Sequence, residues 1–438
     1  MKIVVAIMVF LHSLTGFTQT QEMVKEAVHQ ILSPALDLYY HLHAHPELSL
    51  MEVNTAKTLS SELRQIGFEV SEKVGSHGIV GVYRNGKGPV ILVRTDMDAL
   101  PVKEQSGLSY SSQVITQNFS GDQRPAMHAC GHDMHMSVWT GTAKVLTQLK
   151  DQWTGTLLFI AQPAEEHGDG AMNMLEAGLF ENFPLPDYAL ALHVSANLPA
   201  GKVGYTPGYS YSNVDAMEIT VFGEGGHGAY PHITIDPVVL SARIVLALQT
   251  LRSREFSPQE PLVLTVGAIN GGTKGNVIPD EVNLKLTLRY HNESLRTQII
   301  ESIRRICNGI AASAGLPEDK YPRLKYYESN LPGVYNDPDL TQSLSRVFEQ
   351  ALGQENVKLL PASMGGEDFG RFGATKHDIP ICIFSLGAVE GEKYQASLKN
   401  ERELPSLHSS KFAPDPYPTL KTGITAMSNA VLYLLKVK

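Results

Sequence analysis

The order of the predicted strands and helices constrains the fold of this chain more than any other feature. Over residues 21–204, apolar runs at 90–93, 156–161 and 188–194 alternate with helical patterns such as the one at 134–150. Continuous apolar runs of this length are typical of strands that are buried on both faces. The alternation therefore predicts an α/β fold, with a mainly parallel sheet and helices on both of its faces.

The pattern changes after Gly208. Strand-like runs occur at 213–222, 262–269 and 324–328, and apolar and polar residues alternate strictly over 282–290, which is typical of a strand with one wet face. One helical pattern lies between the runs at 213–222 and 262–269, and another lies between the runs at 282–290 and 324–328. The resulting order, β-α-β-β-α-β, predicts a ferredoxin-like α+β layer.

Local signals mark where some helices begin and end. Asn54 is expected to cap a helix that stops at Gly67. Asp236 is followed by Pro237, the combination of an N-cap and a proline at the first helical position, and this helix is expected to run to about Arg252.

The length of the chain, 438 residues, is that of two or three domains. We expect a catalytic α/β domain made of residues 20–207 and 330–438. A smaller domain at 208–329 is expected to interrupt it.

Composition excludes several classes of protein. Hydrophobic residues make up 43% of the chain and charged residues 18%, so wholesale disorder is excluded. Lys and Arg number 36 against 45 Asp and Glu, a net charge of −9, and there is no basic block. We therefore expect neither nucleic acid nor a membrane as a partner. With only three cysteines there is no disulfide framework.

Residues 1–19 have the pattern of a secretory signal peptide. Lys2 precedes an apolar run at 3–11, which is followed by a small and polar stretch at 15–19. The run is too short for a bilayer-spanning helix. A buried first helix is the alternative, which His12 makes less favourable. The signal predicts export to a periplasm or to the exterior.

Chemically active side chains cluster around the ends of the predicted strands. Such residues follow or lie near three strand ends, and others precede the helix at 134–150: Asp96, Asp98, Cys130, His132, Glu165, Glu166 and His193. In open α/β sheets, ligands bind in the crevice beyond the carboxyl ends of the strands. These side chains are therefore expected to converge on one site.

The mixture of thiolate, imidazole and carboxylate indicates a metal site. This set suits Zn, Co, Ni or Mn better than Mg or Ca, which prefer oxygen ligands. At a strand end, one of the adjacent Glu165 and Glu166 can bind a metal while the other acts as general base on a water whose pKa the metal lowers towards about 7. Asp98 is a candidate for orienting a metal-binding imidazole.

Taken singly, these residues carry weak signals. A lone Cys130 is more often a small buried hydrophobe than a ligand, and His193 alone is more often a hydrogen-bonded core histidine. His43 and His45, near Glu47, resemble a metal cluster but fit a turn at a helix end equally well. His408 has almost no signal of its own.

Eight sequence blocks resemble one family across nearly the whole chain. They are His43-Ala44-His45-Pro46-Glu47-Leu48-Ser49, Arg94-Thr95-Asp96-Met97-Asp98-Ala99-Leu100-Pro101, Met127-His128-Ala129-Cys130-Gly131-His132-Asp133-Met134-His135, Gln162-Pro163-Ala164-Glu165-Glu166, Leu192-His193-Val194, Gly225-Gly226-His227-Gly228-Ala229-Tyr230-Pro231-His232, Asn276-Val277-Ile278-Pro279-Asp280 and Met364-Gly365-Gly366-Glu367-Asp368-Phe369. The chain resembles the metal-dependent amidohydrolases that include hippurate hydrolase, N-acyl-amino-acid amidohydrolases and auxin-conjugate (IAA-amino acid) hydrolases, in the aminoacylase and carboxypeptidase clan.

The resemblance implies a site with two divalent metal ions, Mn above all, with Zn, Co or Ni as alternatives. The positions that match the family's ligands are Cys130, His132, Glu166, His193 and His408, with the thiolate between the two metals.

The resemblance also implies roles for other residues. Glu165 matches the general base and Asp98 the residue that supports a metal-binding imidazole. His227 and Asn276, on the inserted domain, match positions that contact the substrate, with His227 reaching across a homodimer. The insert would then be a lid and a dimerisation domain.

These implications lead to a hypothesis of function: a metal-dependent hydrolase that cleaves the amide bond of N-acyl amino acids or short peptide-like conjugates. An aminopeptidase, carboxypeptidase or dipeptidase of the same clan is the alternative. Two further readings stay open, a thiol hydrolase with Cys130 as nucleophile and a histidine as base, and a non-catalytic exported protein that binds metal or peptide.

Overall fold

The computed structural model describes residues 2–326 and 331–435, with side chains from residue 19 onwards. By its internal contacts the chain divides into two compact units. The first consists of Met1–Ser210, Tyr335–Pro361 and Asp368–Lys438, and the second of Tyr211–Val334 and Ala362–Glu367.

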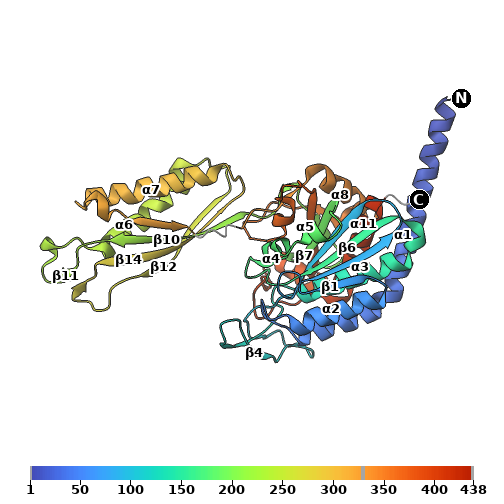
Figure 1. The fold of residues 1–438 in the computed structure, drawn as a ribbon, viewed down its shortest axis with the longest axis horizontal. Coiled ribbons are helices and arrows are strands. Elements are labelled where there is room, and N and C mark those ends of the chain that lie inside the picture. Colours follow the sequence, from blue (N-terminus) through green and yellow to red (C-terminus); the bar gives the residue numbers. More distant parts are fainter. Residues whose placement is uncertain (1, 327–330, 436–438) are drawn as a thin grey trace. The chain divides into compact units, whose positions relative to one another are not determined.

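The first unit is built on an eight-stranded sheet in the order β1-β2-β6-β3-β7-β18-β8-β17 (Figure 1). The strands are β1 Glu69–Glu72, β2 Ile79–Asn85, β3 Val90–Asp96, β6 Gly155–Gln162, β7 Tyr188–Pro199, β8 Val203–Tyr205, β17 Val357–Leu359 and β18 Ile381–Val389. The central neighbours β6, β3, β7 and β18 pair in parallel. Antiparallel pairs occur between β1 and β2, β2 and β6, and β18 and β8. The mainly parallel sheet expected from the apolar runs is confirmed.

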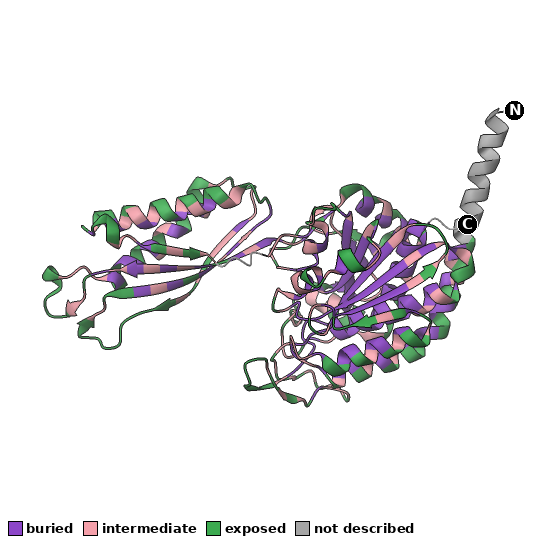
Figure 2. Ribbon diagram, in the orientation of Figure 1, coloured by how far each residue is buried: buried purple, intermediate pink, exposed green. Residues whose placement is uncertain are grey.

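Helices bury this sheet. The longer ones are α1 Lys2–Ala44, α2 Val53–Gln65, α3 His132–Gln148, α8 Pro338–Leu352 and α11 Pro416–Leu435. Helices α1, α3 and α11 pack against one another, and α3 and α11 also contact β3. Leu157 and Phe159 of β6 belong to the core that these helices share. Leu158 and Ile160, which point the other way along the strand, are also fully buried, so both faces of β6 are covered (Figure 2).

The start of α2 differs from the expectation. The helix begins at Val53, and Asn54 lies inside its first turn instead of capping it. The side chain of Glu47 accepts hydrogen bonds from the backbone N–H of Asn54 at 3.1 Å and of Thr55 at 2.8 Å. An acceptor from the preceding loop thus satisfies the first free N–H groups of the helix, so α2 begins without a cap from Asn54.

The second unit contains a four-stranded antiparallel sheet in the order β12-β14-β10-β15. Its main elements are β10 Asn213–Phe222, α6 Pro237–Thr250, β12 Leu262–Asn270, β14 Glu281–Tyr290, α7 Leu295–Ser313 and β15 Arg323–Tyr326. They follow one another in the predicted β-α-β-β-α-β order. Asp236 caps α6 as expected, because its side chain accepts from the N–H of Val238 at 2.8 Å. The end of the strand expected at 324–328 lies outside the described residues.

The remaining elements are short. They are β4 Ile115–Gln117, β5 Gln123–Pro125, α4 Gly170–Glu176, α5 Leu179–Asn182, β9 Gly208–Tyr209, β11 Gly226–His227, β13 Val277–Ile278, β16 Tyr335–Asn336, α9 Gly370–Gly373 and α10 Gly391–Leu398, together with η1 Lys150–Gln152, η2 Pro231–Ile233, η3 Leu251–Glu255, η4 Glu318–Lys320 and η5 Gln354–Asn356. Among the helices that the structure describes, none combines the length and apolar character needed to cross a bilayer. The expected signal peptide falls almost entirely on residues whose side chains are not described.

Candidate active site

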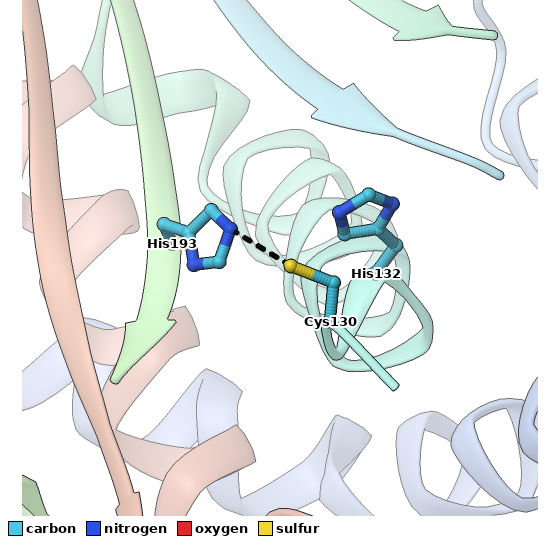
Figure 3. A group of neighbouring side chains, drawn as sticks. All are labelled: Cys130, His132 and His193. Atoms are coloured by element: carbon cyan, nitrogen blue, oxygen red, sulfur yellow. Dashed lines mark hydrogen bonds between the residues drawn. The ribbon is translucent and has the colours of Figure 1, made fainter. Parts of the chain in front are cut away.

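The predicted site residues of the first unit come together where β3, β6 and β7 meet α3. Asp98 follows β3, Glu165 and Glu166 lie in the turn after β6, and His193 is part of β7. Cys130 and His132 flank Gly131 at the start of α3 (Figure 3). The convergence follows from the sheet order, which places β6 and β7 on either side of β3.

Gly131 allows the chain to place Cys130 and His132 in one site. It is the N-cap of α3 and has a φ of 83°, a left-handed conformation that glycine adopts without steric cost. A Cβ atom at this position would lie 2.5 Å from Cγ2 of Val194. The start of α3 therefore approaches β7 more closely than a side chain would permit.

The sulfur of Cys130 is the centre of the site. Its Sγ lies 3.5 Å from Nε2 of His193 (Figure 3). It also lies 3.3 Å from Nε2 of His408. Nε2 of His408 is in turn 3.3 Å from Oε1 of Glu166. The thiol thus contacts His193 on one side, and His408, which pairs with Glu166, on the other.

Hydrogen bonds to backbone carbonyls define the tautomers of two histidines. Nδ1 of His132 is 2.8 Å from the carbonyl oxygen of Asp98, and Nδ1 of His193 is 2.8 Å from that of Val194. Because a carbonyl oxygen only accepts, each Nδ1 carries a hydrogen, and in the neutral ring that binds a metal each Nε2 presents a lone pair. Nε2 of His132 is buried and has no hydrogen-bond partner, as expected of an atom that binds a metal.

The donor atoms form compact sets that could hold metal ions. One set is Cys130, His132 and His193, and another is Cys130, Glu166 and His408; in each, the donor atoms lie within 4.8 Å of one another. Both sets contain Cys130, which fits a thiolate between two cations. Sulfur, imidazole and carboxylate donors suit Zn, Co, Ni or Mn.

A fourth histidine near the site, His135, has both ring nitrogens occupied by hydrogen bonds to its neighbours. Its Nδ1 lies 2.7 Å from Oδ1 of Asp96, and its Nε2 accepts from the N–H of Val194 at 2.9 Å. Burial lowers the pKa of His135 to about 4, so the ring is neutral. Asp96, His132 and His135 also lie close enough to hold a metal, but His135 has no free lone pair for one.

Asp98 contacts the acidic turn as well as His132. Its carbonyl oxygen takes the hydrogen bond from His132, and its carboxylate Oδ1 is 3.4 Å from the same ring nitrogen. The carboxylate accepts the N–H of Glu165 at 3.1 Å and of Glu166 at 3.0 Å. Although burial opposes ionisation, the hydrogen bond with His132 and the bond from Ser49 lower the pKa of Asp98. Asp98 therefore links the start of α3 to the turn after β6.

A buried ion-pair network lies behind the site, and the sequence analysis did not identify it. Arg94 donates to Asp96 at 2.7 Å, to Asp368 at 3.0 Å and to Gln162 at 3.0 Å. Asp368 also accepts from Gln162 and from the N–H of Ala171. Arg94 and Asp96 are two residues apart on β3 and therefore share a face of the strand. This spacing could have predicted their ion pair from the sequence. Asp368 lies 274 residues from Arg94, and no spacing in the sequence predicted their contact.

The pKa of Cys130 argues against the thiol-nucleophile alternative. Burial raises the pKa of the thiol well above its usual value, and the neighbouring Glu166 and Glu165 raise it further, although His132 opposes this. A nucleophilic cysteine requires a lowered pKa. The raised pKa favours the protonated thiol, and a bound cation would supply the counter-charge that a thiolate needs here.

His408, which had almost no signal in the sequence, is held beside Cys130 by its backbone. Its φ is 66°, an uncommon left-handed value, and its N–H donates to the carbonyl of Ala129 at 2.9 Å. The hydrogen bond with Glu166 raises the pKa of the His408 imidazole. The left-handed turn directs the ring towards both Cys130 and Glu166.

His227 and Asn276 are neighbours within the second unit. The N–H of Gly228 donates to the carbonyl of Asn276 at 2.9 Å, and β11 pairs with β13 beside them. Nδ1 of His227 accepts from the N–H of Ala229 at 3.0 Å, so Nε2 carries the hydrogen. The side chain of His227 is exposed and offers an N–H donor.

The block that contains His43 and His45 supports the structure instead of forming a metal cluster. His43 is buried between Asp133, at 2.6 Å, and Glu104, at 3.0 Å. His45 bonds the carbonyl of His41, and Glu47 holds the first turn of α2. The reading of this block as a turn at a helix end is the better description.

Comparison with known proteins extends these observations over most of the chain. Residues 92–404 match the model of peptidase family M20/M25/M40. Thermostable carboxypeptidase 1 of Saccharolobus solfataricus is 34% identical over 415 residues, which cover 94% of this chain and 97% of that protein. Hippurate hydrolase of Campylobacter jejuni is 33% identical over 379 residues, 85% of this chain and 89% of the relative.

A solved structure agrees. A dinuclear metal-binding peptidase of the M20 family from Bacillus subtilis superposes with a TM-score of 0.75 at 28% identity, covering 94% of this chain and 100% of the other. The resemblance found in the sequence blocks is thereby confirmed. The chain belongs to peptidase family M20/M25/M40 and is a metal-dependent hydrolase of linear amide bonds.

Proposed function

We propose that this enzyme hydrolyses the amide bond of N-acyl amino acids or short peptide-like conjugates at a two-metal site. The observation that carries the proposal is the position of Cys130, which belongs to two donor sets at once. Glu165 lies beside both sets, with Oε2 4.0 Å from Nε2 of His132. It also forms a donor set with His132 and Glu166, but neither of the two sets that share Cys130 includes it. A carboxylate next to the metal ligands, and not needed as one, is suited to proton transfer.

In this proposal the two ions would be held by Cys130, His132 and His193 on one side and by Cys130, Glu166 and His408 on the other. When bound, such ions lower the pKa of water and polarise the scissile carbonyl. Glu165 takes a proton from the attacking water at its carboxylate and passes it to the leaving amine. Asp98 holds the N–H groups of Glu165 and Glu166, which orients the base.

We propose Mn as the native metal, with Zn, Co or Ni as alternatives that the same donors accept. The thiolate favours the softer of these ions, whereas the carboxylate suits Mn. Elemental analysis of the purified enzyme and reconstitution of the apoenzyme with each metal in turn would decide between them.

We further propose that the second unit is a lid and a dimerisation domain. In this proposal, the Nε2–H of His227 stabilises the oxyanion that forms on the substrate, and reaches it from the partner of a homodimer. Asn276 binds the substrate beside it. Measurement of the molar mass in solution tests the dimer. Mixing His227→Ala subunits with Glu165→Gln subunits tests the crossing, because activity returns only if one subunit completes the other's site.

Cleavage of peptides is a second candidate function, which the similarity to a carboxypeptidase over 94% of the chain favours. A panel of N-acyl amino acids and dipeptides with each metal supplied separates the two functions. A third alternative, a non-catalytic protein that binds metal or peptide, predicts metal-loaded protein that hydrolyses no member of this panel.

We also propose that residues 1–19 direct export and are then removed. Lys2 and the apolar run after it are the features that support this. Expression of the full chain, followed by N-terminal sequencing of the protein outside the cytoplasm, tests the proposal. A mature chain that still begins at Met1 would contradict it.

The central experiment is the variant Glu165→Gln. It removes the proton acceptor and leaves the proposed ligands in place. We expect it to retain the metal content of the wild type while kcat falls by about 100-fold or more, the usual worth of a general base. Wild-type activity in this variant would show that Glu165 is not the base.

A further inference from the structure

Glu52 is a fully buried carboxyl group to which the proposed mechanism assigns no role. It is the N-cap residue of α2, but its side chain makes no capping bond and points into the protein. Its Oε1 accepts two backbone hydrogen bonds, from Leu50 at 3.0 Å and from Ala164 at 2.8 Å. Both donors have a left-handed backbone, with φ values of 67° for Leu50 and 53° for Ala164.

Ala164 immediately precedes the acidic pair of the site. Its N–H is bound by Glu52, and the next two N–H groups, of Glu165 and Glu166, are bound by Asp98. The backbone of this turn is thus held by two buried carboxyl groups at three consecutive positions. A non-glycine residue with positive φ persists only where its surroundings enforce that conformation.

A second connection joins the same two carboxyl groups. Ser49 donates its hydroxyl to Asp98 at 2.6 Å, and Leu50, the next residue, donates its N–H to Glu52. Asp98 and Glu52 therefore each bind both the loop before α2 and the turn after β6. A shift of Glu52 would release Ala164 and, through it, the two glutamates.

We propose that Glu52 is a positioning residue for Glu165 and Glu166, which it holds by fixing the left-handed turn at Ala164. The inference rests on the proposed function, because it concerns the proposed base and a proposed ligand. Glu52 needs no contact with metal or substrate for this role. It acts through the backbone alone.

The protonation of Glu52 suggests the variant that should preserve this role. Burial and the nearby charge of Asp98 raise the pKa of Glu52 to about 8, so the group is largely neutral at pH 7. Oε2 has no hydrogen-bond partner. A glutamine has the same shape, and its amide oxygen can accept the same two N–H groups.

The experiment compares Glu52→Ala and Glu52→Gln with a matched control, Glu47→Ala. Glu47 is an acid of the same loop that also accepts two backbone N–H groups, but those belong to α2 and not to the acidic turn. The measurements are kcat, KM, metal content after dialysis and the melting temperature.

For Glu52→Ala we expect kcat to fall by about 10- to 100-fold, with weaker retention of metal, as for other residues that orient ligands. Glu52→Gln should restore kcat to within about threefold of the wild type, since the two hydrogen bonds survive. Glu47→Ala should lower the melting temperature and leave kcat unchanged. If Glu52→Ala does not fold, Glu52→Met fills the same space without an acceptor and is tested in its place.

Two results would overturn the inference: wild-type kcat and metal retention in folded Glu52→Ala or Glu52→Met, or an equal loss in Glu52→Gln. Failure of the proposed function has a different signature, because the wild type itself would then hydrolyse none of the panel. In that case, retention of metal by the variants still tests whether Glu52 positions Glu166.

Discussion

Nε2 of His408 lies 3.3 Å from Sγ of Cys130, although 278 residues separate the two in the chain. The loop that contains His408 is fixed by a backbone hydrogen bond to Ala129, the residue before Cys130. The same ring nitrogen is 3.3 Å from Glu166. One imidazole therefore completes a donor set whose other members come from the start of α3 and the turn after β6.

Replacement of His408 by alanine should remove one of the two proposed ions. Cys130 and Glu166 alone leave that position with two ligands, whereas Cys130, His132 and His193 remain intact. We expect elemental analysis to show a fall from about two metal ions per chain to about one, with loss of most activity. His167→Ala is the control, because that exposed imidazole bonds to Asp169. Two ions retained in His408→Ala would contradict the assignment.

Replacement of Gly131 by alanine should disturb the site through its backbone. The new Cβ would meet Cγ2 of Val194 at 2.5 Å, and the left-handed φ alone costs about 1–2 kcal/mol. We expect a lower melting temperature together with weaker metal binding, because Cys130 and His132 flank this residue. Gly121→Ala is a matched control with a φ of 85° and no atom within 4 Å of the new Cβ. It should lose stability but keep its metal.

His43 should make the stability of the protein depend on pH. Burial disfavours the charged ring, but its hydrogen bonds to Asp133 and Glu104 outweigh this and raise the pKa of His43 to about 10, from 6.5. The stabilising contribution is therefore complete below about pH 6.5 and is lost as the pH rises through about 10. The same contacts lower the pKa values of Asp133 and Glu104, so their contribution is lost only at acidic pH.

The variant His43→Asn should lower the free energy of unfolding by about 3–5 kcal/mol near neutral pH, because it leaves buried carboxylates without their partner. Urea unfolding of both proteins between pH 6 and pH 10 measures this. The difference between wild type and variant should shrink as the pH rises. A difference that does not change with pH would show that His43 is not charged in the folded protein. His45→Asn, which removes a bond to a backbone carbonyl, is the control.

Much of the fold could be predicted from local patterns. The strand at 213–222 and the N-cap at Asp236 occur where the sequence predicts them, and β3 and β6 extend only slightly beyond the apolar runs. Strand periodicity and capping depend on residues near one another in the chain, so they can be read directly. The cap at Asn54 was wrong because Glu47, in the preceding loop, satisfies the N–H groups of α2.

The kind of chemistry at the site could also be predicted from its residue types. Cys130, His132 and the Glu165-Glu166 pair predicted a metal site because few other roles need thiol, imidazole and adjacent carboxylates at strand ends. The sequence could not show which atoms are free to bind. That depends on hydrogen bonds such as the one from His132 to the carbonyl of Asp98, which leaves Nε2 as a lone pair.

The sequence by itself therefore determined the elements, their order and the kind of chemistry, since each of these follows from spacing along the chain. Apart from the site positions that the family resemblance implied, only the tertiary structure decided which distant residues meet. His408 reaches Cys130, Asp368 reaches Arg94 and Glu52 reaches Ala164 because the sheet order and two left-handed turns bring their loops together. Such contacts are made across the fold, where no local period or cap signal exists to reveal them.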